Sequence, residues 1–300
     1  MNYSKFEETV PGNCYHVCTD GQESPIIMRE VDDYRIAQNY LAIAAWTTDV
    51  YILAYSIMSN HIHSAVICKN RKAAEQFIKK FKKLYSMYLY NKYGIKQALH
   101  GIGDSITLID SIQYLRNCIA YILRNALCAK ICTKIEDYRW SSYSCYFNKS
   151  KTETHKPASS LGIREKKRIL KTHADLSDCP YLIDKDGYIV SKSFVRYDLV
   201  ERIFKNSGRY LLFHLGTCND SQMEYEMACK PLTKVNDTDM IIAAEKAAST
   251  RFQGKTLADL DTKAKCSLIK YLYFNNKTTI PQLSRVLGLS RSLVSRILSS

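Results

Sequence analysis

The chain has 300 residues, 46% of them hydrophobic, which is enough for a buried core and for more than one domain. Its net charge of +14 is spread over both halves and favours a polyanionic partner, although charge alone does not distinguish DNA from RNA or an anionic membrane. The 11 cysteines form no CxxC pattern, the opening residues carry acids without an apolar run, and no uncharged stretch is long enough to span a bilayer. We therefore expect a cytoplasmic protein with reduced thiols, no secretory signal and no membrane partner.

The first half of the chain alternates between strand and helix patterns. In chain order, hydrophobic periodicity predicts a strand at 13–19, a helix at 31–46, strands at 50–58 and 61–68, a helix at 71–93, a short strand at 106–109 and a helix at 114–127. Ser59 and Asn60 leave only a short turn between the two middle strands, so we expect those strands to pair antiparallel. The predicted order is β-α-β-β-α-β-α.

The sequence after Trp140 loses this regular pattern. Residues 148–160 are polar and lysine-rich, which suits an exposed linker, so we place the end of the first domain at residue 147. Residues 148–257 are predicted to be a linker and a connecting region whose fold the sequence does not define. The last segment, residues 258–300, contains three helical patterns separated by short turns.

The two closely spaced helical patterns near the end of the chain suggest a helix-turn-helix. Gly288 lies where a tight turn between helices needs it, and Ser290 is a suitable N-cap for the last helix. That helix would present side chains that can reach base edges or phosphates, namely Arg291, Ser292, Ser295 and Arg296. The alternative is a plain three-helix packing unit, so DNA binding by this segment is a hypothesis.

His61 and His63 are candidate metal ligands on one predicted strand. Because successive side chains of a strand point to opposite faces, the two imidazoles share a face while Ile62 enters the core. Two converging imidazoles make half of a metal site, but a His-x-His pair is also common on exposed strands. The neighbouring segments must therefore decide between these two interpretations.

Four segments, in order, resemble the one-tyrosine HUH transposases, the IS200-like group. MSNHIHSAVI at 58–67 is similar to the histidine strand of that family, and CYHVCTDG at 14–21 is similar to its opening strand. YILRNALCAKI at 121–131 resembles the tyrosine helix of the REP-associated subgroup, and DYRWSSY at 137–143 resembles the signature that follows it. Together the matches cover residues 13–146.

The resemblance implies a ferredoxin-like α+β domain at 1–147, with a central antiparallel sheet and flanking helices, that cleaves and transfers single-stranded DNA. It also implies that Tyr121 is the nucleophile and that His61, His63 and Asn125 hold a divalent metal. Residues four apart share one face of a helix, so Tyr121 and Asn125 project together. An ion such as Mg²⁺ or Mn²⁺ would polarise the phosphate for attack by the phenol, giving a 5′-phosphotyrosine.

Two residues of the tyrosine segment depart from the family pattern. Ala126 stands where the family usually has proline, and Cys128 stands where a basic residue is common. Neither is an expected ligand or nucleophile, so we expect these departures to affect only the end of the tyrosine helix.

Basic side chains on two predicted helices are candidate DNA contacts, and the expected partner is single-stranded or hairpin DNA. They are Lys79, Lys80, Lys82, Lys83, Arg116 and Arg124. Charged flanks of this kind are also often only solvated. The rival functions are a DNA-binding regulator that has lost turnover and an RNA-binding protein, for which the chain lacks an aromatic ribonucleoprotein signature. Monomer and homodimer both stay open, as does whether Tyr121 serves its own chain or a partner.

Overall fold

The computed structural model describes residues 10, 12–21, 25–148, 155–218, 237–276, 278 and 280–299. The chain forms two compact units, residues 1–227 and 228–300, each with a hydrophobic core of its own. The elements of the first unit up to the tyrosine helix are β1 (Asn13–Thr19), α2 (Val31–Thr47), β2 (Tyr51–Ile57), β3 (Ile62–Cys68), α3 (Arg71–Tyr93), β4 (Asp104–Ile109) and α4 (Ile112–Cys128). The predicted β-α-β-β-α-β-α order is confirmed.

The elements of this unit differ from the predictions mainly at their ends. β4 begins at Asp104, two residues early, because Asp104 pairs with Thr19 of β1. α4 begins at Ile112 because the side chain of Ser111 accepts a hydrogen bond from the backbone N–H of Tyr114, as an N-cap does. Apolar periodicity alone does not detect such polar end positions.

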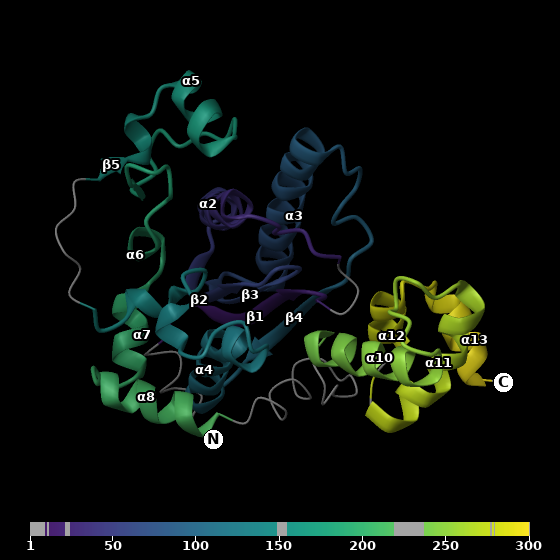
Figure 1. Cartoon of the computed structure of the whole chain (residues 1–300). Helices are drawn as coiled ribbons and strands as arrows, with labels where there is room; N and C mark the ends of the chain where they lie inside the picture. Colours follow the sequence, from purple (N-terminus) through teal and green to yellow (C-terminus); the bar gives the residue numbers. More distant parts are fainter. Residues whose placement is uncertain are drawn as a thin grey trace. The chain divides into compact units, whose positions relative to one another are not determined.

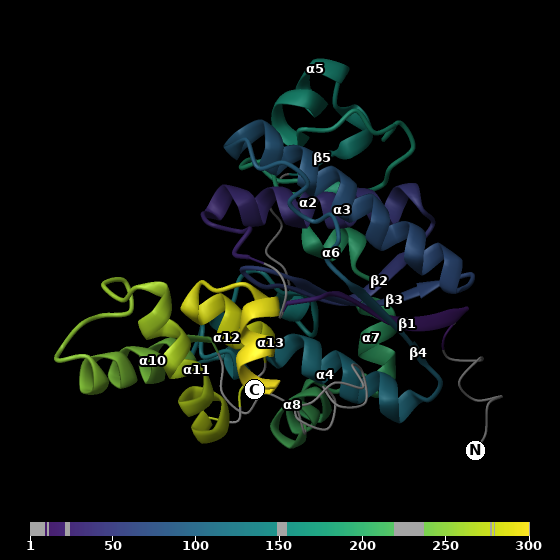
Figure 2. The ribbon, with the colours of Figure 1, turned by 90° about the vertical axis from the view of Figure 1, so that its right-hand side faces the viewer.

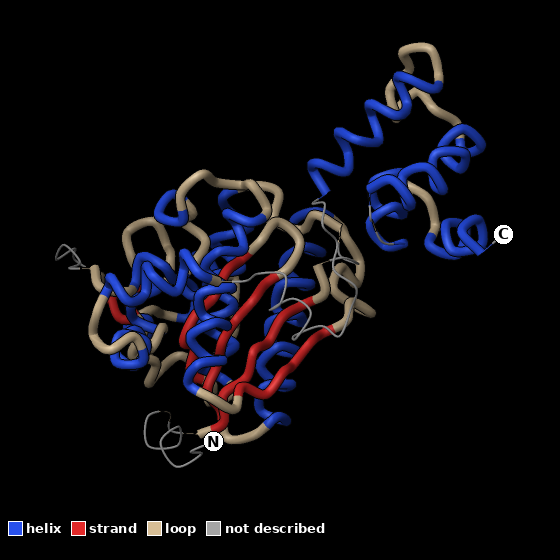
Figure 3. The backbone as a smooth tube through the Cα atoms, turned by 90° about the horizontal axis from the view of Figure 1, so that it is seen from below, coloured by secondary structure: helices blue, strands red, loops and turns tan. Residues whose placement is uncertain are grey.

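A four-stranded antiparallel sheet forms the centre of the first unit, in the order β2-β3-β1-β4 (Figure 3). β1 lies between β3 and β4, and it pairs with both of them. Its register places Cys18 directly opposite His63 and His16 opposite Ala65. Because opposed residues of an antiparallel pair share a face, His16, Cys18 and His63 all lie on one side of the sheet.

Helices cover both faces of this sheet. α2 and α3 pack together on one face, and α4 lies across the other (Figures 1 and 2). The strand that carries His16 therefore alternates between two layers, with Tyr15 and Val17 toward α3 and His16 toward α4. The histidine side chains thus lie between the sheet and α4.

The tryptophan-serine-serine segment completes the edge of the sheet at β2. The backbone N–H of Ile57 donates to the carbonyl of Trp140 at 2.9 Å, and Ser56 bridges to Ser141. The N–H of Tyr55 donates to Oγ of Ser142 at 3.0 Å. An exposed edge strand offers unpaired backbone groups to other chains, and this segment satisfies them within the chain.

A buried carboxylate joins α2 to the end of α3. Asp33 is fully buried, and it accepts hydrogen bonds from the Tyr88 hydroxyl at 2.8 Å and the Tyr93 hydroxyl at 2.9 Å. Nζ of Lys92 lies 2.6 Å from the same carboxylate. Burial disfavours the charged form of Asp33, but these donors and the backbone N–H of Arg29 outweigh it, so the pKa of Asp33 is below its ordinary value.

Residues 155–218, whose fold the sequence does not define, belong to the first unit and pack against its earlier elements. Their elements are β5 (Lys156–Pro157), α5 (Ile163–Glu165), β6 (Leu182–Ile183), α6 (Ser191–Phe194), α7 (Tyr197–Ile203) and α8 (Gly208–Thr217). The side chain of Asn39 on α2 joins this segment through the carbonyl of Gly187, at 2.8 Å, and the N–H of Ile189, at 2.7 Å. Residues 149–154 of the expected linker lie outside the described residues.

The second unit is helical. It contains α10 (Asp237–Arg251), α11 (Thr262–Asn276), α12 (Ile280–Leu287) and α13 (Arg291–Ser299). α11 begins at Thr262 because the side chain of Asp261 accepts a hydrogen bond from the N–H of Ala264, as an N-cap does. Gly288 turns the chain between α12 and α13 with a φ of 65°, a conformation that favours glycine. No helix among the described residues of the chain is long and apolar enough to cross a membrane.

Candidate active site

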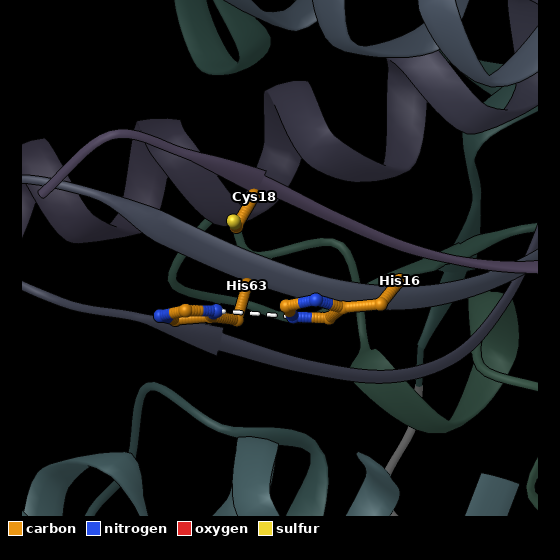
Figure 4. A group of neighbouring side chains, drawn as sticks. All are labelled: His16, Cys18 and His63. Atoms are coloured by element: carbon orange, nitrogen blue, oxygen red, sulfur yellow. Dashed lines mark hydrogen bonds between the residues drawn. The ribbon is translucent and has the colours of Figure 1, made fainter. Parts of the chain in front are cut away.

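His16 and His63 lie side by side on neighbouring strands, facing α4 (Figure 4). Nε2 of His16 is 3.1 Å from Nδ1 of His63, a hydrogen-bonding distance. The two rings are almost parallel, with an interplanar angle of 11° and centroids 5.3 Å apart. His16 therefore supports one edge of the His63 ring.

His61 precedes β3 and joins this group from its other side. Its ring centroid is 4.9 Å from that of His63, with the rings nearly perpendicular. Nδ1 of His61 lies 2.6 Å from Oδ1 of Asn60, and Nδ2 of Asn60 donates to the carbonyl of Gly21 at 2.6 Å. The two imidazoles of the predicted pair thus lie together, and Asn60 fixes the orientation of one of them.

Gly21 allows the His61 ring to occupy this position. A Cβ atom at Gly21 would lie 2.5 Å from Nδ1 of His61 and 2.8 Å from Cγ, which is closer than any real contact. The glycine after β1 is thus needed for the approach of an imidazole, not for an unusual φ. A side chain here would displace His61 or the turn.

Tyr121 approaches the histidines from α4. Its ring is edge-on to His63, with centroids 5.5 Å apart, and edge-on to His16 at 6.2 Å. Only 6% of the tyrosine is exposed. Asn125 lies one turn further along, and its Nδ2 donates to the carbonyl of Tyr121 at 2.9 Å. The structure therefore brings Tyr121 to the histidines, whereas the described hydrogen bonds of the Asn125 side chain stay within α4.

Burial keeps the two strand histidines neutral. Desolvation lowers the pKa of His16 to about 3. Desolvation and, to a smaller extent, the neighbouring imidazoles of His61 and His16 hold the pKa of His63 well below its ordinary value. A neutral imidazole has a lone pair on one ring nitrogen, which is the form that binds a metal.

His16, Cys18 and His63 offer a cluster of donor atoms that lie within 4.8 Å of one another, and this cluster is consistent with a metal site. Sequence analysis did not place His16 or Cys18 in the site. The period-two pattern of the first strand could have shown that they share a face. It could not have shown that this face meets His63, because that follows from the register of β1 on β3.

The predicted lysines on α3 have different environments. Lys82 donates to the carbonyl of Ile102 at 2.6 Å and to the carboxylate of Asp104 at 2.8 Å. Lys79 and Lys83 are exposed and line a cavity beside that helix, and Lys80 is half-buried.

The predicted arginines on α4 are engaged with the segment that follows it. Nε of Arg116 donates to the carbonyl of Ile203 at 2.9 Å, and Nη1 of Arg124 donates to the carbonyl of Leu215 at 2.6 Å. Both therefore hold α7 and α8 against α4. On α13 the four side chains predicted to contact DNA are exposed, while Val294 between them is buried in the core of the second unit.

Part of the chain is similar to a known family of transposases. Residues 15–103, which include both predicted metal histidines, match the family described as "Transposase IS200 like". This part of the chain is therefore similar to the IS200-like transposases, and the matched residues make up less than a third of the chain. Tyr121 and Asn125 lie beyond the matched residues.

A solved structure similar to this chain is described as "Structure of the REP associates tyrosine transposase bound to a REP hairpin". The two share 13% sequence identity over 44% of this chain and 77% of that chain, with a TM-score of 0.34. No curated protein matches the chain.

Proposed function

We propose that this protein is a metal-dependent endonuclease and strand transferase of single-stranded DNA, built on a ferredoxin-like HUH domain, with Tyr121 as its nucleophile. The observation that carries this proposal is the edge-on approach of the Tyr121 ring to the His63 ring, with centroids 5.5 Å apart. The two rings meet between α4, which carries Tyr121, and the sheet, which carries His63. A tyrosine that only fills the core would not need to meet a buried, neutral histidine beside a second imidazole. The similarity of residues 15–103 to the IS200-like transposases supports the same chemistry.

We propose that His61, His63 and Asn125 hold the metal. The donor set fits a divalent ion, since two neutral imidazoles and an amide oxygen leave coordination positions for a phosphate. Because Nδ2 of Asn125 is engaged by its own helix, its Oδ1 is the atom left for a ligand. Nitrogen donors favour Mn²⁺ over Mg²⁺, and either ion would supply Lewis-acid polarisation of the phosphate.

The cluster of His16, Cys18 and His63 is less suited to be the whole metal site. Nε2 of His16 and Nδ1 of His63 share one hydrogen bond, so one of these two nitrogens carries the proton and offers no lone pair. A thiolate ligand would also select a softer ion than Mg²⁺ or Mn²⁺. We therefore assign His16 to positioning His63.

In the proposed reaction, Tyr121 cleaves the DNA strand and holds its 5′ phosphate. The oxygen of Tyr121 attacks the phosphorus as the phenol loses its proton. A phosphotyrosine bond forms to the 5′ side, and the bond to the 3′ oxygen breaks as that oxygen gains a proton. The phenolate is a better leaving group than an alkoxide, so a second 3′-hydroxyl can reverse the step and join the strand elsewhere. The narrow layer between α4 and the sheet restricts water, which would otherwise compete with that hydroxyl.

The proposed substrate is single-stranded DNA that contains a hairpin, as the resemblance to the REP-associated subgroup implies. Lysines of α3, Arg116, Arg124 and the exposed residues of α13 are proposed contacts with it. Arg116 and Arg124 would contact DNA only with donors not used on α7 and α8.

The test uses hairpin-containing single strands taken from the DNA that flanks the protein's own gene, incubated with Mg²⁺ or Mn²⁺. We expect a label on the 3′ side of the cleaved phosphate to migrate with protein in a denaturing gel. Label on the 5′ side should stay free, because the tyrosine joins the 5′ phosphate. Label that never migrates with protein, under conditions where the DNA is bound, would favour a DNA-binding regulator without turnover.

A further inference from the structure

A cavity of about 490 Å³ lies along α3. This helix covers the face of the sheet opposite α4 (Figures 1 and 2). Four of its lining residues form a stripe on the helix, namely Lys79, Lys83, Met87 and Tyr90. Spacings of four, four and three residues place them on one face. The segment at 97–101 forms the opposite wall, with His100 among its residues.

Apolar side chains remain open to solvent in this cavity. Met87 is 53% exposed and Tyr90 is 52% exposed, whereas Tyr85 and Leu89 on the inner face of the helix are fully buried. An exposed aromatic ring and a thioether at the same mouth provide flat, polarisable surfaces. Such surfaces suit a planar ligand that stacks on them with one face and leaves its other face in solvent.

The cavity is basic. Among the residues that line it there is no acid, and within the described part of the chain neither Lys79 nor Lys83 forms a salt bridge. The charge of Lys82, in contrast, is compensated by Asp104, and its ammonium group also holds the carbonyl of Ile102. Lys82 therefore stabilises the wall, and Lys79 and Lys83 are left for an anion.

The wall of this cavity is joined to the end of the sheet that carries His61. Its last residues lead to Gly103, whose carbonyl accepts from the N–H of Asp20 at 2.9 Å. Asp20 precedes Gly21, the glycine against which the His61 ring lies. The wall of the cavity and the turn that positions His61 therefore lie at the same end of the sheet.

We infer that this cavity binds one nucleotide of the single-stranded DNA on which the enzyme acts, with the base against Tyr90 and Met87 and the neighbouring phosphates at Lys79 and Lys83. The inference rests on the proposed function and adds a second DNA site to it. Duplex DNA fits poorly, because its bases are stacked on one another and offer no free face. A base stacked on an aromatic side chain beside lysines is the usual mode of single-strand binding.

The test measures binding of the full chain, in EDTA, to a fluorescent dT20 strand and to a duplex of equal length. Tyr90→Ala should weaken binding to dT20 about tenfold and leave duplex binding unchanged, while Tyr90→Phe should bind like the parent. Tyr90→Leu keeps the surface apolar without a ring and should bind like the alanine variant. For dT20 binding, the slope of the logarithm of the binding constant against the logarithm of the salt concentration should become shallower by about 0.7 in Lys83→Gln, the value for one phosphate on a single strand. Lys72→Gln, on the same helix but outside the cavity, should leave this slope unchanged.

Photochemical crosslinking locates the base directly. A strand with 5-bromouracil in place of thymine should crosslink to the peptide that contains Tyr90, and Tyr90→Ala should remove that crosslink. Equal binding of dT20 by the parent and Tyr90→Ala, or a crosslink mapped elsewhere, would overturn the inference. Covalent adduct formation at Tyr121 is measured separately, so a parent that forms the adduct without any role for Tyr90 disproves only the cavity. A parent that shows the Tyr90 dependence but never forms an adduct disproves only the proposed catalysis.

Discussion

Nε2 of His16 lies 3.1 Å from Nδ1 of His63 across the β1–β3 pair, so this contact occupies Nδ1 and leaves Nε2 as the ring nitrogen of His63 that can face an ion. A neutral imidazole has one N–H and one lone pair. If His63 donates its Nδ1 proton to His16, its lone pair is on Nε2. His16 then keeps its own proton on Nδ1, a buried atom that has no hydrogen-bond partner in the described structure. In this arrangement the Nδ1–H of His16 is an unsatisfied donor, while Nε2 of His16 holds the His63 ring.

Replacement of His16 should therefore weaken metal binding. We expect His16→Ala to raise the dissociation constant for Mn²⁺ by 10- to 100-fold, the usual effect of losing a residue that orients a ligand. His16→Asn can still accept a hydrogen bond from His63, so this variant should recover part of the lost Mn²⁺ affinity. Calorimetry or the electron paramagnetic resonance signal of free Mn²⁺ measures this without DNA.

Cys18 provides the matched control for that measurement. It lies on the same face and belongs to the same donor cluster, but the proposed site does not use its thiol. Cys18→Ala should therefore leave Mn²⁺ affinity within about twofold of the parent. A loss as large as that of His16→Ala would mean that the cluster of His16, Cys18 and His63 itself holds the ion.

The glycine beside His61 gives a second prediction. Gly21→Ala should lower Mn²⁺ affinity at least tenfold, because the new methyl group would displace the His61 ring, 2.5 Å away. Gly103→Ala is the control on the neighbouring turn, where a Cβ atom meets Asp20 at an ordinary 3.7 Å. If both variants bind Mn²⁺ equally well, His61 is not held by this contact.

The sequence predicted the elements from β1 to α4 well, because each follows from local periodicity. The face shared by His61 and His63 follows from the alternation of a strand, and the position of Tyr121 relative to Asn125 follows from a helix. The contribution of His16 was missed because it depends on which residue of β3 lies opposite β1. Register is set by the whole buried face and not by any one segment.

Residues 155–218 show why the rest could not be predicted. This segment has short helices and two-residue strands, and polar contacts such as those of Asn39 and Arg124 join it to α2 and α4 in addition to its buried apolar side chains. A helix of four residues has too few turns to produce a periodic pattern. The contacts join residues roughly 90 to 150 positions apart, and no local signal marks them.

The buried carboxylate between α2 and α3 predicts how stability depends on pH. Asp33→Asn should lower the free energy of unfolding by about 3 kcal/mol, because Lys92 loses its buried partner. Since the pKa of Asp33 is lowered on folding, its contribution is present above about pH 3.9, the ordinary aspartate value, and is lost as the pH falls through the folded-state pKa.

Urea denaturation at several pH values checks this. The neighbouring Asp32→Asn is the control: its side chain is 41% exposed, so its loss should cost less than about 1 kcal/mol. The parent should lose stability more steeply than Asp33→Asn as the solution is acidified from pH 5 to pH 3. Parallel curves for the two proteins would contradict the assigned role of Asp33.

The second unit should supply a separate share of DNA affinity. Removal of residues 228–300 should weaken DNA binding and reduce its salt dependence, while the first unit keeps its own core. The paired substitution Arg291→Gln with Arg296→Gln should reduce the salt slope by about one to two. Lys263→Gln with Lys270→Gln removes the same charge from exposed positions of α11. Equal effects of the two pairs would show that only net charge matters and that α13 makes no specific contact.

Removal of a single oxygen at Tyr121 should separate binding from chemistry. Tyr121→Phe keeps the ring against His63 and His16, so the variant should bind hairpin DNA nearly as well as the parent. It supplies no nucleophile, so it should form no covalent adduct. Tyr114→Phe, which removes a hydroxyl from the same helix, should still form the adduct, and peptide mapping of the parent should place the label on residues 121–124. An adduct that survives in Tyr121→Phe would assign the nucleophile to another residue, because phenylalanine has no oxygen with which to hold the phosphate.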